Sequence, residues 1–120
     1  MKSRHKYLLV SCLLALGLVI GFGSLFSQQT AGELFEKALY VEEAQGDLQK
    51  AVVLYQDLLK KFPDERQVAA KAQLHIGICF EKLGLKQAQE AFQKVVENYP
   101  EQAEAVKLAR EKLARLIKVQ

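Results

Sequence analysis

The apolar residues after position 30 recur every three or four positions, which is the spacing of amphipathic helices. The pattern is interrupted at Gly46, Pro63, Gly84 and Pro100. Glycine permits the left-handed turn that ends many helices, and proline cannot continue one. The sequence therefore predicts an all-α fold of five helices, over residues 31–45, 48–62, 65–83, 87–98 and 101–119.

The helix starts carry residues that can accept hydrogen bonds from free backbone N–H groups. Thr30 followed by Glu33 predicts a capping box, and Asp47 and Asp64 are expected to cap the second and third helices. Gly77 lies inside the third helix, where glycine costs about 1 kcal/mol relative to alanine. We expect that its missing side chain lets the fourth helix approach closely.

The two halves of this region repeat one another. Gly46 and Gly84 are 38 residues apart, and the other matching pairs are 37 residues apart: Ala51 with Ala88, Tyr55 with Phe92, and Pro63 with Pro100. A fixed offset of this size indicates a helical-repeat array, in which each hairpin buries its apolar face against the next. The sequence thus predicts a solenoid of two α-α hairpins, over residues 30–63 and 64–100.

The last helix, within residues 101–120, has one apolar face and one charged face. Ala105, Ala109 and Leu113 recur at helical spacing, and most of the remaining positions are charged. This pattern is typical of a capping helix at the end of an array. The alternative is the first half of a third hairpin, and an exposed Leu108 or Leu116 would favour that open, stacking end.

Residues 1–29 have the arrangement of a signal peptide or signal anchor. A basic start is followed by an uncharged run over residues 7–26 and by polar Ser27, Gln28 and Gln29. Twenty apolar residues are long enough to span a bilayer as a helix, so cleavage and retention both stay open. A lipid-modified Cys12 is disfavoured, because the apolar run before it is too short. Either outcome predicts an extracytoplasmic domain, in the periplasm or anchored in the inner membrane.

The net positive charge comes from residues 1–29, the predicted leader. The chain has 17 basic and 14 acidic residues, a formal charge of +3, and Lys2, Arg4 and Lys6 account for the excess. The domain is therefore neutral, and it lacks the basic face that nucleic-acid binding requires. We expect no nucleic-acid partner, but a membrane partner through residues 7–26 if the leader is retained.

No residue pattern in the chain points to catalysis or to a cofactor. His75 and Cys79 share one helix face, but two ligands do not make a metal site. Cys79 is expected to fill a small inward position, and only an exposed thiol could form an intermolecular disulfide. The adjacent acidic pairs, Glu42–Glu43 and Asp64–Glu65, are expected to be caps or solvated residues. We therefore predict no enzymatic activity, no cofactor and no metal.

The second hairpin resembles the tetratricopeptide repeat, and the resemblance extends over about residues 31–118. It is carried by Gly77, Phe80, Leu83, Gly84, Ala88, Phe92, Val95 and Pro100. The first hairpin keeps Gly46, Ala51, Tyr55 and Pro63, but it has Leu39 and Glu42 where the family has a small residue and an aromatic one. The details look most like bacterial envelope proteins of the periplasmic YbgF type and the assembly lipoprotein BamD.

The resemblance implies a non-enzymatic adaptor of the bacterial cell envelope whose first helices line a concave groove for a protein partner. The alternative is a membrane-tethered structural subunit or a homo-oligomer. At matching positions, the groove would be lined by Glu36, Tyr40, Glu43, Lys71, Leu74, Ile78, Glu81, Lys107 and Glu111. We expect Tyr40 and Ile78 to matter most, because apolar and aromatic side chains offer burial to a partner.

Overall fold

The computed structural model describes residues 28–119, and within that range it contains five helices and no strands. The predicted all-α class is therefore confirmed for this part of the chain. The predicted leader run over residues 7–26, with Cys12, lies outside the described residues. The helices are α2 (Ala31–Glu43), α3 (Leu48–Lys61), α4 (Arg66–Lys82), α5 (Gln87–Asn98) and α6 (Ala103–Val119). Between residues 28 and 119, none of the helices combines the length and the apolar character that crossing a membrane requires.

The predicted caps of the first two helices and the two glycine turns are confirmed, whereas α6 begins at Ala103 and not at residue 101. The Thr30 hydroxyl accepts a hydrogen bond from the Glu33 N–H, and the Asp47 carboxylate accepts one from the Lys50 N–H, each at 3.1 Å. Gly46 and Gly84 have φ angles of +67° and +70°, the left-handed conformation that glycine adopts without a steric penalty. These two glycines make the tight turns that fold each hairpin back on itself.

The prediction that Asp64 caps the third helix is wrong. The Glu65 N–H donates to the Phe62 carbonyl, and the Glu65 carbonyl accepts the first helical bond from Ala69, so α4 begins one residue later than expected. No side chain caps this helix end. The turn after Phe62, rather than the nearest acidic residue, sets the start of α4.

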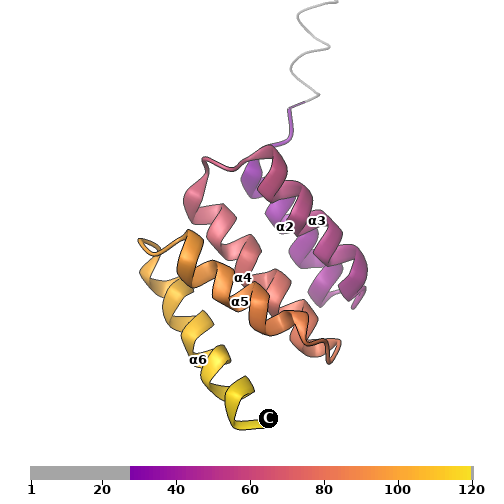
Figure 1. Cartoon of the computed structure of the whole chain (residues 1–120). Coiled ribbons are helices and arrows are strands. Elements are labelled where there is room, and N and C mark those ends of the chain that lie inside the picture. The colour runs from indigo at the N-terminus through magenta and orange to yellow at the C-terminus, as the bar shows by residue number, and fades with distance from the viewer. Residues whose placement is uncertain (1–27, 120) are drawn as a thin grey trace, which may run out of the picture.

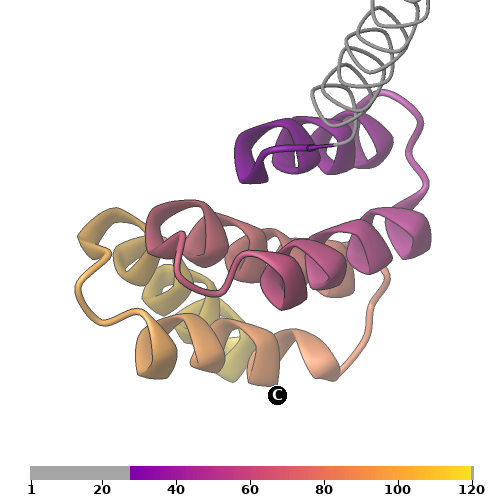
Figure 2. The ribbon, with the colours of Figure 1, turned by 90° about the horizontal axis from the view of Figure 1, so that it is seen from above.

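Successive helices pack on one another, and α4 also contacts α2 and α6 (Figures 1 and 2). One apolar cluster lies among α2, α3 and α4, around the fully buried Tyr55 and Leu58. A second lies among α4, α5 and α6, around the fully buried Phe92 and Val95. Since α4 belongs to both clusters, it is the helix that joins the two hairpins into one domain.

Gly77 provides the close approach that its place in the sequence predicts. A Cβ atom built on Gly77 would lie 2.5 Å from the nearest carbon of the Phe92 ring. That ring is completely buried, so it has little freedom to move away. The α4–α5 hairpin therefore depends on the absence of a side chain at position 77.

Arg66 fixes the other end of α4 to the turn before α6. Its guanidinium donates to the Glu101 carboxylate and to the Asn98 carbonyl, and lies 5.0 Å from the centre of the Tyr99 ring. These contacts join α4 to the segment that leads into α6. They help to set the distance between the two helices that border the candidate site.

Gly77→Ala should destabilise the domain even though alanine is the better helix former. The clash with Phe92 should cost about 1–3 kcal/mol, against a propensity gain of about 1 kcal/mol, so we expect a net loss of stability. Urea unfolding of the full-length chain followed by circular dichroism measures it.

Gly32→Ala is the matched control, because a Cβ at Gly32 would meet only the Thr30 hydroxyl, at 3.9 Å. That variant should be as stable as the parent or slightly more stable. A Gly77→Ala protein as stable as Gly32→Ala would contradict the role assigned to Gly77.

Candidate functional site

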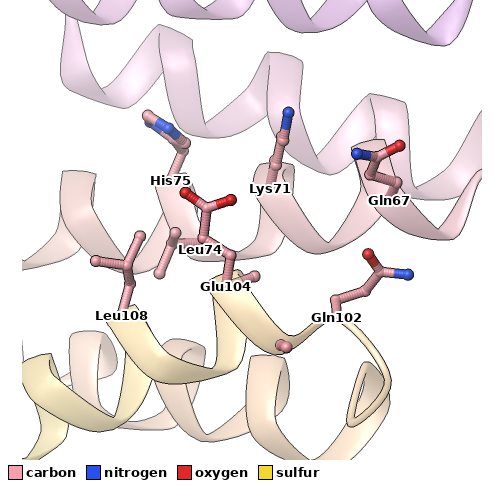
Figure 3. Close-up of a pocket in the computed structure, with 9 residues that line it drawn as sticks. Gln67, Lys71, Leu74, His75, Gln102, Glu104 and Leu108 are labelled. Carbon is pink, nitrogen blue, oxygen red and sulfur yellow. The ribbon is translucent and has the colours of Figure 1, made fainter.

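A depression opens on the surface between α4 and α6. Its volume is about 260 Å³, and α4 forms one wall while the start of α6 forms the other (Figure 3). The lining residues are Gln67, Lys71, Leu74 and His75 from α4, with Gln102, Ala103, Glu104, Ala105 and Leu108 from the α6 side.

The floor of the depression is apolar. Leu74 and Ala105 are buried, whereas Leu108 is 41% exposed. Leu74 from α4 and Leu108 from α6 lie next to each other in this floor (Figure 3). An exposed leucine beside buried apolar neighbours offers a partner side chain apolar surface to cover.

Two charged side chains on the walls lack a partner among residues 28–119. Lys71 rises from α4 on the side away from α6, and Glu104 reaches from α6 toward α4 (Figure 3). Both are exposed, and neither takes part in a hydrogen bond or an ion pair within that range. By contrast, His75 already has a partner, because its Nδ1 atom lies 2.8 Å from the buried Glu42 carboxylate.

The structure brings together two of the nine residues predicted to line the groove, Lys71 and Leu74. Ile78 is half-buried and packs against the second apolar cluster, and Glu81 accepts a hydrogen bond from Lys112. The other five are exposed and lie outside this depression: Glu36, Tyr40, Glu43, Lys107 and Glu111. Tyr40, at 60% exposure, is still available as a contact on α2.

The repeat offset carries the signal that points to the residues on the α6 wall. Pro63 and Pro100 are 37 residues apart. Adding 37 to Lys71 gives Leu108, and adding 37 to Gln67 gives Glu104, both of which line the depression. The 37-residue offset therefore points to Leu108 on the α6 wall, one residue after the predicted Lys107.

A buried polar cluster lies directly behind His75. The Glu42 carboxylate, 1% exposed, accepts a hydrogen bond from the Tyr55 hydroxyl at 2.7 Å and is bonded to His75 at 2.8 Å. Lys82 lies 3.4 Å from its other oxygen. The expectation that Glu42 is a cap or a solvated residue is wrong, because α2, α3 and α4 enclose it.

The surroundings of Glu42 keep it ionised. Burial raises the pKa of its carboxyl group, but hydrogen bonds from His75 and Tyr55, with the positive charges of His75 and Lys82, outweigh burial and lower the pKa below 4.5. The same carboxylate, together with burial, raises the pKa of Tyr55, which stays protonated and donates. Within residues 28–119, no buried side-chain nitrogen or oxygen lacks a hydrogen-bond partner.

A second acid–base contact joins α4 to α6. Lys112 of α6 donates to Glu81 of α4 at 2.8 Å, and both side chains are about one-third exposed or less. It parallels the Glu42–His75 contact between α2 and α4. Acid–base contacts thus join α2 to α4 through the buried Glu42, and α4 to α6 through the partly exposed Glu81.

Neither Cys79 nor the His, Asp and Glu residues among the described residues form a reactive or metal-binding group. Cys79 is fully buried, as expected, and burial with the nearby Glu42 charge raises the pKa of its thiol to about 12. A thiol in that environment is a poor nucleophile and is not accessible for an intermolecular disulfide. In the range 28–119, no three His, Cys, Asp or Glu side chains are grouped so that they could hold a metal ion.

Comparison with protein families gives one result. The sequence model described as tetratricopeptide repeat matches residues 31–65 and residues 71–101, which together make up more than half of the chain. Comparisons with curated proteins and with solved structures gave no match.

Glu42→Gln should destabilise the domain at neutral pH, because it removes a buried charge on which Tyr55, His75 and Lys82 converge. Hydrogen bonds to charged groups contribute about 1.5–3 kcal/mol, so we expect a loss of about that size. The folded-state pKa of Glu42 is lowered, so its contribution is present above pH 4.5 and is lost as pH falls through the folded-state value. Urea unfolding between pH 3 and 7 should show a steeper acid loss in the parent than in Glu42→Gln.

Glu43→Gln is the matched control, since Glu43 is the exposed neighbour of Glu42 on the same helix. Its unfolding free energy should follow that of the parent at every pH. Equal effects of the two substitutions would show that the buried cluster contributes nothing specific to stability.

Proposed function

Because the chain belongs to the tetratricopeptide repeat family, whose repeats generally mediate protein–protein interactions, we propose that it is a non-enzymatic adaptor. It holds a segment of a partner protein in the depression between α4 and α6. The observation that carries the proposal is the partly exposed Leu108 on an apolar floor, bordered by the unpaired charges of Lys71 and Glu104. An apolar anchor site with a polar rim is the usual anatomy of a protein-binding surface.

The exposed Leu108 meets the criterion set above for an open, stacking end, but the charged residues on the outer face of α6 support an external partner over stacking of further copies. The offset of 37 residues places Lys107 and Arg110 where α4 has Ala70 and Gln73. Ala70 is fully buried, and the Gln73 amide donates to the Ala91 carbonyl of α5. A hairpin stacked on α6 in the same way would have to bury two cations, which is costly without matching acids.

Self-association is the second candidate function, because the C-terminal end of α6 exposes an apolar side chain. Ile117 is 64% exposed, and the 37-residue offset matches it with Phe80, which is packed in the apolar core. A second copy could cover this end without burying Lys107 or Arg110. In that case the chain is a structural subunit that assembles with itself.

We place the adaptor on the outer side of a bacterial inner membrane, in the manner of the YbgF and BamD types that its repeats resemble. The basic start and the uncharged residues 7–26 support this location. The neutral domain that follows is consistent with a protein partner rather than a nucleic acid.

A photo-crosslinking amino acid placed at Leu108 should capture a partner protein in growing bacteria, because this side chain lies at the exposed edge of the floor. Immunoblots and mass spectrometry identify the adducts. Val53 is the matched control, since it is an apolar residue of α3, 62% exposed, that does not line the depression. Equal yields of the same adduct from both positions would contradict the groove assignment.

The mass of the adduct separates the two candidate functions. The chain has a mass of 13.5 kDa, so an adduct between two copies is near twice that value. Self-adducts formed at Ile117, with none to another protein at Leu108, would favour the structural subunit over the adaptor.

The intact mass of the protein in membrane and periplasmic fractions tests the proposed location. A full-length mass confined to the membrane means that residues 7–26 are a permanent anchor. A mass that begins near Ser24 or Gln28, in the periplasmic extract, means a released periplasmic adaptor. Full-length protein in the cytoplasmic fraction would contradict both.

A further inference from the structure

The depression is small for a whole ligand but large enough for one side chain. Its volume of about 260 Å³ lies below the roughly 300–1,000 Å³ of typical small-molecule pockets. Its only broadly apolar part is the floor made by Leu74, Ala105 and Leu108. A segment lying across it can therefore insert a single large apolar side chain, and its neighbouring groups must meet the walls.

The walls present one free base and one free acid to those neighbouring groups. Lys71 and Glu104 have no partner among residues 28–119, whereas His75 is occupied by Glu42, and Glu81 by Lys112. The free acid lies beside the floor and the free base lies farther along α4, pointing away from α6 (Figure 3). Along the site, the apolar floor at Leu74 and Leu108 is therefore followed first by the unpaired acid and then by the unpaired base (Figure 3).

We propose that the segment held between α4 and α6 carries one large apolar side chain, a basic group next to it and an acidic group beyond the basic one. The apolar side chain covers Leu108, the acidic group pairs with Lys71, and the basic group pairs with Glu104. The amide of Gln67, which both donates and accepts hydrogen bonds, can serve the backbone of the segment. This inference rests on the proposed function, because it names the partner chemistry of the same depression.

Four peptides test the proposal, each acetylated, amidated and of the form Gly-Leu-Gly-Z-Gly-X-Gly. In an extended chain, alternate residues share a face, so X, Leu and Z all point toward the protein. The X and Z pairs are Glu with Lys, Gln with Gln, Glu with Glu, and Lys with Lys. Binding is measured at 0.15 M salt from amide NMR shifts of Leu74, Ala105 and Leu108 in the full-length chain, kept in detergent.

The parent protein should bind the Glu/Lys peptide about two- to fivefold more tightly than the Gln/Gln peptide, the usual effect of an exposed ion pair. Lys71→Glu leaves two acids on the walls and should bind the Lys/Lys peptide most tightly. Glu104→Lys leaves two bases and should bind the Glu/Glu peptide most tightly. The two substitutions change preference in opposite directions, which a loss of folding cannot produce.

Lys50→Glu and Glu97→Lys are the matched controls. Both residues are exposed and lie outside the depression, on α3 and α5. Charges beyond about 8 Å are largely screened at this salt concentration, so these variants should keep the parent's order of preference. A control that changes the order as strongly as the groove variants would overturn the proposal.

The remaining outcomes separate this inference from the function on which it rests. If all four peptides shift the groove amides with equal Kd, the depression binds an apolar side chain but the charge pattern is wrong. If none of the four shifts those amides in the folded parent, both the pattern and the binding role of the depression are overturned.

Discussion

The buried carboxylate of Glu42 is the constraint on which the junction of the two hairpins depends. Burying a charge costs several kcal/mol unless its partners are correctly placed. Here the partners come from two other helices, Tyr55 from α3, and His75 and Lys82 from α4. A shift of any one helix along its axis would remove at least one of these partners, so this cluster helps to fix the register of all three helices in a way that apolar packing alone does not.

The same cluster decides which charges are left for a partner. His75 lines the depression, but its Nδ1 atom is engaged by Glu42 from behind, so the wall of α4 presents the charge of Lys71 instead. Further along α4, Glu81 is engaged by Lys112 in the same way. Lys71 and Glu104 are thus the charged residues that line the depression and have no partner among residues 28–119.

The sequence predicted the features that depend on neighbours in the chain. The left-handed turn at Gly84 is set by the local need to end a helix, and Gly77 is informative because glycine is unfavourable inside one. Glu42 was missed because its burial depends on Tyr55 and His75, 13 and 33 residues away. Composition does not show whether an acid at a helix end will find such partners.

Only part of the candidate site was predicted from the sequence, because the positions chosen on α6 were not those that line the depression. Lys71 and Leu74 were identified because they lie on α4, whose matching positions within the second hairpin are clear. The α6 wall was placed at Lys107, whereas the 37-residue offset from Lys71 gives Leu108, which lines the depression. A helix turns by about 100° per residue, so an error of one position moves a side chain from the groove to a neighbouring face.

The size of the depression limits how tightly it can bind on its own. Covering one leucine-sized side chain contributes about 1.5–3 kcal/mol, and two exposed ion pairs add about 2 kcal/mol at most. Association itself costs several kcal/mol, so this site alone gives weak binding. The proposed membrane anchor would offset this limit, because two proteins confined to one membrane meet at a high effective concentration. A short groove and a retained leader would therefore work together, whereas a released periplasmic adaptor would need further contacts, for which the exposed Tyr40 on α2 is available.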